Sequence, residues 1–208
     1  MAVVRIKICG ITRSQDARVA VSAGAWAVGF VFYPQSPRFI NLNKARAIIK
    51  SLPPFIEPVG VFVNETEEKV KRIASFCSLR TLQFHGDESP SYCRFFKTKF
   101  KVIKAFRVAD QCDIKTIQRY DVSAVLMDTY QPGRYGGTGI PFSWSLMKNL
   151  GHLEMPLIIS GGLTSDNVKQ ALTKFEPFAV DVSSGVESSP GIKDRRKIEN
   201  FINAVYVT

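Results

Sequence analysis

The sequence predicts a single α/β domain, residues 1–208, in which eight parallel strands close into a (β/α)8 barrel of the TIM-barrel type. Eight short apolar segments rich in Val, Ile and Phe alternate along the chain with segments of helical period. No linker, low-complexity tract or break in composition divides these units. A closed barrel leaves no sheet edge to protect, and 208 residues is near the compact limit of this fold.

Each predicted strand is a short apolar run. The first, "VVRIKIC", carries two cations and ends in a cysteine that a glycine follows. The next three are "AVGFVF", "PVGVFV" and "TLQF", and the last four are "VIKAF", "AVLMD", "LIIS" and "FAVDV". β-Branched and aromatic residues dominate them, as is typical of buried strands. The predicted strands are residues 3–9, 27–32, 58–63, 81–84, 102–106, 124–128, 157–160 and 178–182.

Amphipathic segments such as "SQDARVAVSAG", "LNKARAIIKSL" and "SDNVKQALTKF" lie between the strands and predict the helices. The expected N-caps of these three are Ser14, Asn41, and Ser165 or Asp166. An open doubly wound sheet is the structural alternative. Its glycine-rich dinucleotide turn is absent after the first strand, where only "CGIT" stands, so we expect no nicotinamide or flavin cofactor.

The composition limits where the protein can work in the cell and which groups it can bind. Arg5 and Lys7 interrupt the apolar start, and the longest uncharged apolar run, residues 23–33, is too short to span a bilayer. We therefore expect a cytoplasmic protein with no membrane association. The four cysteines form no Cys-x-x-Cys pair and there are only two histidines, so neither a metal site nor a disulfide framework is expected.

The formal net charge of +10 suggests an anionic partner. The basic residues are dispersed along predicted helices, often at helical spacing from Glu, as on a solvated face. This favours a small phosphorylated or carboxylated substrate over nucleic acid.

In a barrel the chemistry lies at the carboxyl ends of the strands. Cys9 ends the first predicted strand, and Asp128 ends the apolar run "AVLM". Desolvation disfavours the ionised form of such a carboxyl group and suits it to act as a general acid, although a helix cap or a loop ion pair is the alternative. Cys9 is either a packed apolar residue or a reactive thiol, and Lys7 on the same strand face could favour its thiolate.

Small residues follow the seventh and eighth strands, where barrels commonly hold a phosphate group. Backbone N–H groups can approach an anion closely there, although a tight turn would also explain the glycines. The residues concerned are Gly161, Gly162, Ser183, Ser184 and Gly185.

Together, "KICGIT", "GFVFYPQSPRFI", "GVFVN", "QFHG", "AFRV", "MDTY" with "GGTG", "ISGGL", and "DVSSGVE" with "PGIKD" resemble the phosphoribosylanthranilate isomerase family of tryptophan biosynthesis. The pieces occur in the family's order at each expected strand exit, from Lys7 to Asp194. The resemblance implies a barrel that catalyses an Amadori rearrangement of N-(5-phosphoribosyl)anthranilate without a cofactor.

The resemblance also implies roles for the matched residues. Cys9 is similar to the family's general base and Asp128 to its general acid, while Arg38 resembles the arginine that binds the anthranilate carboxylate. The glycines and serines named above fall in the family's phosphate-binding loops. An unperturbed thiol is only about 3% ionised at neutral pH, so we expect the site to lower the pKa of Cys9 modestly. Supporting roles are expected for Lys7, Gln83, His85, Gly137 and Gly139.

The chain departs from the family pattern at Ser143, where relatives usually have an aspartate. Serine can still cap a following helix, so the fold should persist. We expect the change to affect the closure or rigidity of the loop between Asp128 and Trp144, and hence the rate. Two alternatives remain. The first is a related phosphoribosyl barrel isomerase that acts in histidine synthesis or on both pathways; Cys9 argues against it, because carboxylates normally do both proton transfers there. The second is a basic, catalytically silent barrel that binds RNA or a partner. A monomer or a homodimer is expected.

Overall fold

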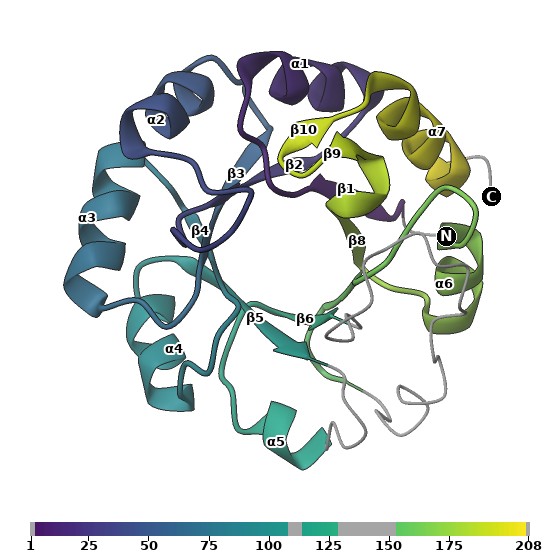
Figure 1. Cartoon of the computed structure of the whole chain (residues 1–208). Coiled ribbons are helices and arrows are strands. Elements are labelled where there is room, and N and C mark those ends of the chain that lie inside the picture. The colour runs from purple at the N-terminus through teal and green to yellow at the C-terminus, as the bar shows by residue number, and fades with distance from the viewer. Residues whose placement is uncertain (1–2, 108–113, 129–152, 207–208) are drawn as a thin grey trace.

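Eight parallel strands form a closed barrel in the computed structural model, which describes residues 3–107, 114–128 and 153–206. The strand order follows the chain, and pairing of β8 with β1 closes the ring (Figure 1). The predicted fold class is confirmed. The strands are β1 (Arg5–Ile8), β2 (Ala27–Val31), β3 (Glu57–Phe62), β4 (Thr81–Phe84), β5 (Lys101–Arg107), β6 (Ala124–Asp128), β7 (Leu157–Ser160) and β8 (Ala179–Val182).

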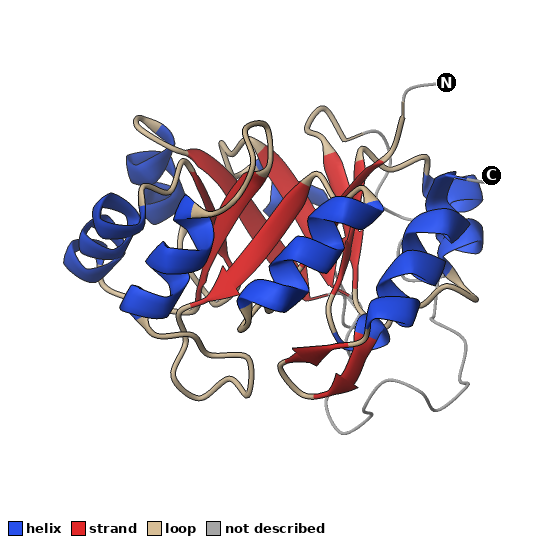
Figure 2. Ribbon diagram, turned by 90° about the horizontal axis from the view of Figure 1, so that it is seen from above, coloured by secondary structure: helices blue, strands red, loops and turns tan. Residues whose placement is uncertain are grey.

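The described helices surround the barrel and cover the outer face of its strands (Figure 2). Three of the eight predicted strands have the observed bounds, and the ends of the other five are shifted by one or two residues. The helices are α1 (Ser14–Ala23), α2 (Leu42–Lys50), α3 (Glu67–Cys77), α4 (Pro90–Lys97), α5 (Ile114–Gln118), α6 (Val168–Phe175) and α7 (Arg195–Tyr206). Among the helices that the structure describes, none combines the length and apolar character needed to cross a bilayer.

The prediction of the helix caps is right for α2, where the Asn41 side chain accepts a hydrogen bond from the backbone N–H of Lys44. It is wrong for α1, because Ser14 is already helical and Arg13 occupies the N-cap position. Arg13 instead binds Asp16 in the first turn through two hydrogen bonds of 2.9 and 2.7 Å.

The prediction of Ser165 or Asp166 as the N-cap of α6 is also wrong. Asn167 occupies that position without capping the helix. Its side-chain oxygen accepts a hydrogen bond of 2.8 Å from the backbone N–H of Thr164. The amide therefore stabilises the turn before α6, and the helix starts one or two residues later than the sequence pattern indicates.

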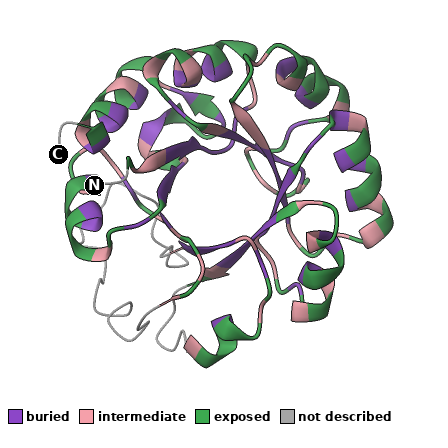
Figure 3. Ribbon diagram, turned by 180° about the vertical axis from the view of Figure 1, so that it is seen from behind, coloured by how far each residue is buried: buried purple, intermediate pink, exposed green. Residues whose placement is uncertain are grey.

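The strands alternate between two environments, and buried strand residues line the ring in Figure 3. Ile6, Ile8 and Phe30 face outward and belong to the large core between strands and helices. The inward side chains of the barrel include a separate apolar cluster of Val59, Ile103, Ala105, Ala124, Leu126, Ile158 and Ala179. Arg5 and Lys7 lie on the face of β1 opposite to Ile6 and Ile8. Lys7 is the nearer of the two to the carboxyl end of the strand, and it is in register with Asp181 of β8. The barrel interior is therefore apolar and packed in its lower part and polar at its mouth, the end where the strands have their carboxyl ends.

A short antiparallel hairpin follows β8 and was not predicted. It consists of β9 (Glu187–Ser189) and β10 (Ile192–Lys193), and a 3-10 turn, η2 (Ser184–Val186), precedes it. A glycine at φ 79°, Gly191, lies in its turn. The hairpin brings two charged side chains to the carboxyl ends of the strands on either side of β1: Glu187 contacts Arg38 after β2, and Lys193 contacts Ser183 after β8.

Candidate active site

Cys9 lies one residue beyond β1 and is only 8% exposed. Its side chain packs with Val31 and Val61 inside the barrel. Gly29 on β2 provides its space, because a Cβ atom there would lie 2.7 Å from the Cys9 Sγ atom. A thiol at this strand exit is thus held at a fixed point of the barrel mouth.

A buried ion pair lies directly below the thiol. The Lys7 Nζ atom is 2.9 Å from Oδ2 of Asp181, and both side chains are about 95% buried. Burial alone lowers the pKa of Lys7, but the Asp181 carboxylate and the neighbouring Cys9 outweigh burial and raise it. Lys7 is therefore a cation at neutral pH. Oδ1 of Asp181 is buried with no hydrogen-bond partner among the described residues.

The expected lowering of the Cys9 pKa is wrong. Burial raises the pKa of the Cys9 thiol, and the opposing charges of Lys7 and Lys193 do not compensate for it. The position of Lys7 was predicted correctly, but the cost of ionising a thiol in the barrel interior is larger than the attraction of one paired ammonium group. The thiol form of Cys9 is therefore favoured at neutral pH.

Gln83, His85 and Asp128 form a line of hydrogen bonds across the carboxyl ends of β4 and β6. The Gln83 Nε2 atom lies 3.0 Å from Nδ1 of His85, and Nε2 of His85 lies 2.9 Å from Oδ2 of Asp128. Since an amide nitrogen only donates, this arrangement makes Nδ1 an acceptor and directs the Nε2 proton at the carboxyl group. The Asp128 side chain is 16% exposed, so it is oriented but still accessible.

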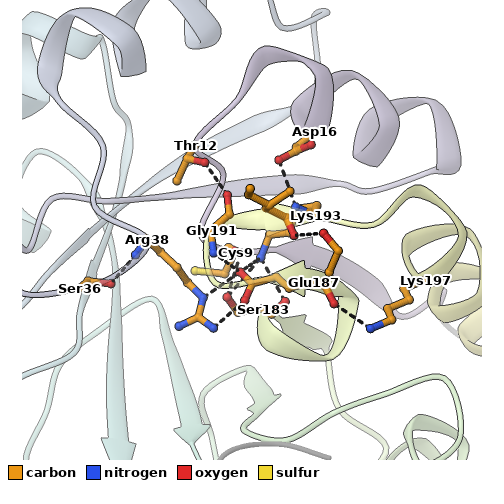
Figure 4. Close-up of polar contacts among 12 residues, drawn as sticks. Cys9, Thr12, Asp16, Ser36, Arg38, Ser183, Glu187, Gly191, Lys193 and Lys197 are labelled. Atoms are coloured by element: carbon orange, nitrogen blue, oxygen red, sulfur yellow. Dashed lines mark hydrogen bonds and ion pairs between the residues drawn. The ribbon is translucent and has the colours of Figure 1, made fainter.

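Arg38 forms a two-point ion pair with Glu187 of β9, with distances of 2.8 Å from Nε and 2.7 Å from Nη2 (Figure 4). Burial raises the pKa of Glu187, but Arg38 and Lys193 outweigh burial and hold it below its usual value. Burial lowers the pKa of Lys193, with Glu187 opposing. Glu187 thus orients the guanidinium, and 24% of the Arg38 side chain is exposed.

Ser183 connects this ion-pair network to the thiol residue. Its hydroxyl donates to the Cys9 backbone carbonyl at 3.1 Å and lies 3.3 Å from the Lys193 Nζ atom (Figure 4). Lys193 is 2.8 Å from Oε1 of Glu187 and is almost fully buried. The Ser183 side chain therefore faces Cys9, and its part in phosphate binding stays a prediction.

The two glycine-containing loops come together beside this network. Gly161 and Gly162 both have positive φ, 88° and 64°, directly after β7. A Cβ atom at Gly185 would collide with the Leu163 carbonyl oxygen, so only glycine lets the two loops approach so closely. Ser184 is exposed in the same turn. The juxtaposition of the loops is as expected, and phosphate binding there stays a prediction.

The structure brings together Lys7, Cys9, Arg38 and Ser183 on one side of the mouth, and Gln83, His85 and Asp128 on the other. Gly137, Gly139 and Ser143 lie outside the described residues. Sequence reasoning missed Asp181, Glu187, Lys193 and Gly29 as site residues. The first two stand in "DVSSGVE", where acidic residues within an apolar strand and its exit could have indicated them.

Comparison with known proteins decides the class of this site. The model of the N-(5'-phosphoribosyl)anthranilate isomerase family matches residues 6–204. The chain belongs to this family. It is therefore an isomerase of tryptophan biosynthesis with the TIM-barrel fold.

Individual relatives agree with the family match over almost the whole chain. The N-(5'-phosphoribosyl)anthranilate isomerase of Geobacter sulfurreducens is 50% identical over 202 residues, which is 96% of this chain and 97% of the relative. Monomers generated from the dimeric phosphoribosylanthranilate isomerase of Thermotoga maritima are similar in structure. The TM-score is 0.88, the identity is 42%, and the match covers 99% of this chain and 100% of the relative.

One solved relative in this family holds a ligand. It is a phosphoribosylanthranilate isomerase in complex with reduced 1-(o-carboxyphenylamino)-1-deoxyribulose 5-phosphate. Its sequence is 41% identical, its TM-score is 0.85, and the match covers 99% of this chain and 100% of the relative.

Proposed function

We propose that the chain converts N-(5'-phosphoribosyl)anthranilate to 1-(o-carboxyphenylamino)-1-deoxyribulose 5-phosphate by an Amadori rearrangement, with Cys9 as general base and Asp128 as general acid. Family membership supports the reaction, and the ligand of the related structure, a reduced form of this product, supports the substrate class. The assignment of residues is carried by one observation: a thiol and a carboxyl group lie at the same end of one barrel, on strands three steps apart.

In the first step Asp128 donates a proton to the ring oxygen of the ribose. The bond between this oxygen and C1′ breaks, and the lone pair of the anthranilate nitrogen forms a C1′=N double bond. The result is an open-chain, cationic Schiff base. The 2.9 Å contact with His85 holds this carboxyl group in place, and a positioned group transfers a proton more effectively than a mobile one.

In the second step the Cys9 thiolate removes the proton from C2′. The released electron pair forms a C1′=C2′ double bond, and the C=N pair returns to nitrogen, which becomes neutral. The enolamine then tautomerises to the ketone. Burial disfavours the thiolate, so the Lys7 cation and the positive charge of the Schiff base are both needed to stabilise it.

Two separate groups of residues bind the two anionic groups of the substrate. Arg38 binds the anthranilate carboxylate, a task that suits a guanidinium already oriented by Glu187. The backbone of Gly161, Gly162, Ser184 and Gly185 binds the phosphate group. With these roles, the substrate would bind between the loop after β2 and the loops after β7 and β8.

We further propose that the protein works as a homodimer in the cytoplasm. The Thermotoga maritima relative is described as dimeric. Phe55, which precedes β3, has a fully exposed aromatic side chain, and we choose it as the position at which to test the dimer. Sedimentation equilibrium of wild type and Phe55→Ser tests the dimer, since a monomeric wild type would contradict it.

A fluorescence assay tests the proposed reaction. Freshly made N-(5'-phosphoribosyl)anthranilate is mixed with the purified protein, and loss of anthranilate-type emission reports the rearrangement. We expect turnover that stops when reduced product is added as a competitor. Absence of any emission change above the uncatalysed rate would overturn the proposed function.

A further inference from the structure

A further buried ion pair takes no part in the chemistry described above. Lys104 of β5 and Glu88, in the loop between β4 and α4, lie 3.0 Å apart, and their side chains are 3% and 2% exposed. Burying two charges costs about as much free energy as their attraction returns, so such a pair is weak grounds for a stability role. The hydrogen bonds of this pair to the neighbouring backbone indicate its role better than its contribution to stability does.

Both partners bind the backbone around His85. The Lys104 Nζ atom donates to the Gly86 carbonyl oxygen at 2.7 Å and lies 3.4 Å from the Phe84 carbonyl oxygen. The Glu88 carboxylate accepts from the backbone N–H of Gly86 at 2.9 Å. The carbonyl groups on either side of His85 are thus bound by one ammonium group.

The Glu88 carboxylate also binds the backbone at the exit of the neighbouring strand, β3. Oε1 of Glu88 accepts from the backbone N–H of Asn64 at 2.9 Å, just after β3. The His85 backbone N–H donates to the Phe62 carbonyl at 2.9 Å, so the residue is fixed from both sides. A third bond, from Lys104 to the Ala105 carbonyl at 3.0 Å, anchors the ammonium group to β5.

We propose that Lys104 and Glu88 form a positioning pair for His85 and, through His85, for the carboxyl group of Asp128. The imidazole lies 2.9 Å from that carboxyl group, and a displacement of about 1 Å in a catalytic group can cost ~10²-fold in rate. The catalytic part of this inference rests on the proposed function; the geometric part does not.

Three variants test the pair: Lys104→Met, Glu88→Gln, and the double variant. Lys104→Met keeps the length of the side chain without its charge. The single change leaves Glu88 as an unpaired buried charge and can prevent folding, whereas the double variant removes both charges. Ile48→Ala, a core truncation in α2 that touches none of these bonds, is the control for lost stability alone.

Two measurements separate positioning from stability. The first is kcat and KM in the fluorescence assay, and the second is the tautomer of His85, read from long-range ¹H–¹⁵N spectra of the imidazole. The chain has only two histidines, so a His152→Asn variant assigns the signals. We expect kcat to fall ~10²-fold with little change in KM, and the His85 signals to move, in the folded pair variants. Ile48→Ala should lose thermal stability without either effect.

A double variant that folds with wild-type kcat and wild-type His85 signals would overturn the positioning role. If the wild-type protein has no turnover, the proposed function fails, and the imidazole spectra alone decide whether the pair positions His85. Altered His85 signals with unchanged kcat would remove the catalytic part of the inference.

Discussion

The imidazole Nε2 atom of His85 lies 2.9 Å from Oδ2 of Asp128, although 43 residues separate them in the chain. The contact joins the exits of β4 and β6, on either side of β5. It gives the Asp128 carboxyl group an orientation that a flexible strand end would lack. The assignment of Asp128 as the proton donor depends on this orientation.

Asp128→Asn should lose the proton donor and keep the fold, because the amide has the same shape. We expect kcat to fall by roughly 10² to 10⁴-fold, the range that general acid catalysis contributes. Asp121→Asn is the matched control, since its carboxylate is exposed in an ion pair with Lys97 just before β6. Equal kcat values for the two variants in the fluorescence assay would rule out Asp128 as the general acid.

Arg38→Ala should mainly raise KM, because it removes the partner of the substrate carboxylate but no group that moves a proton. A hydrogen bond to a charged group contributes about 1.5–3 kcal/mol, so KM should rise by ~10 to 100-fold. Glu187→Gln should raise KM less, because it keeps one acceptor oxygen for the guanidinium. Steady-state kinetics that gave wild-type KM for Arg38→Ala would refute the carboxylate assignment.

Gly29→Ala tests the space that β2 leaves for the thiol. The new Cβ atom would lie 2.7 Å from the Cys9 Sγ atom, so the thiol must shift, and we expect kcat to fall ~10²-fold. Gly60→Ala on β3 is the matched control, because its Cβ would meet the Leu79 side chain at 2.6 Å in the core between strands and helices, away from Cys9. The control should reduce thermal stability and keep kcat; a reversed pattern would contradict the fixed position of Cys9.

Alkylation of Cys9 by iodoacetamide should accelerate with rising pH, because the thiolate reacts and the thiol does not. Burial raises the pKa of Cys9, so the midpoint should lie above the ordinary thiol value of about 8.5. Cys77 is 1% exposed and should react more slowly. Inorganic phosphate should protect Cys9 if it occupies the mouth. A midpoint below 8.5 in the pH profile would contradict the dominance of burial.

The strands and their exits could be predicted because short apolar runs and their polar ends repeat along the chain. Cys9, Arg38, His85 and Asp128 all follow this pattern, and the barrel gathers them at one end. The family resemblance assigned their roles. The sequence pattern reveals each strand exit because an exit is a local feature of the chain. Closure of the barrel then brings the exits together at one end.

Other features depend on contacts between distant segments and left no local signal. The ion pair of Arg38 and Glu187 joins residues 149 positions apart through an unpredicted hairpin. The pKa of Cys9 depends on how far the barrel buries the thiol, which the position of Lys7 in sequence does not reveal. The caps of α1 and α6 were misplaced because side chains there bind elsewhere.

The most direct test of the account is the turnover of Cys9→Ala, with Cys77→Ala as the control for loss of a buried thiol. Both should fold, as judged by circular dichroism and thermal unfolding. We predict that Cys9→Ala loses roughly 10² to 10⁴-fold in kcat while Cys77→Ala keeps it. Adding Asp128→Asn to Cys9→Ala should do little further harm, because both groups serve one conversion. A folded Cys9→Ala protein with near-normal turnover of N-(5'-phosphoribosyl)anthranilate would contradict the account and make Cys9 a packing residue.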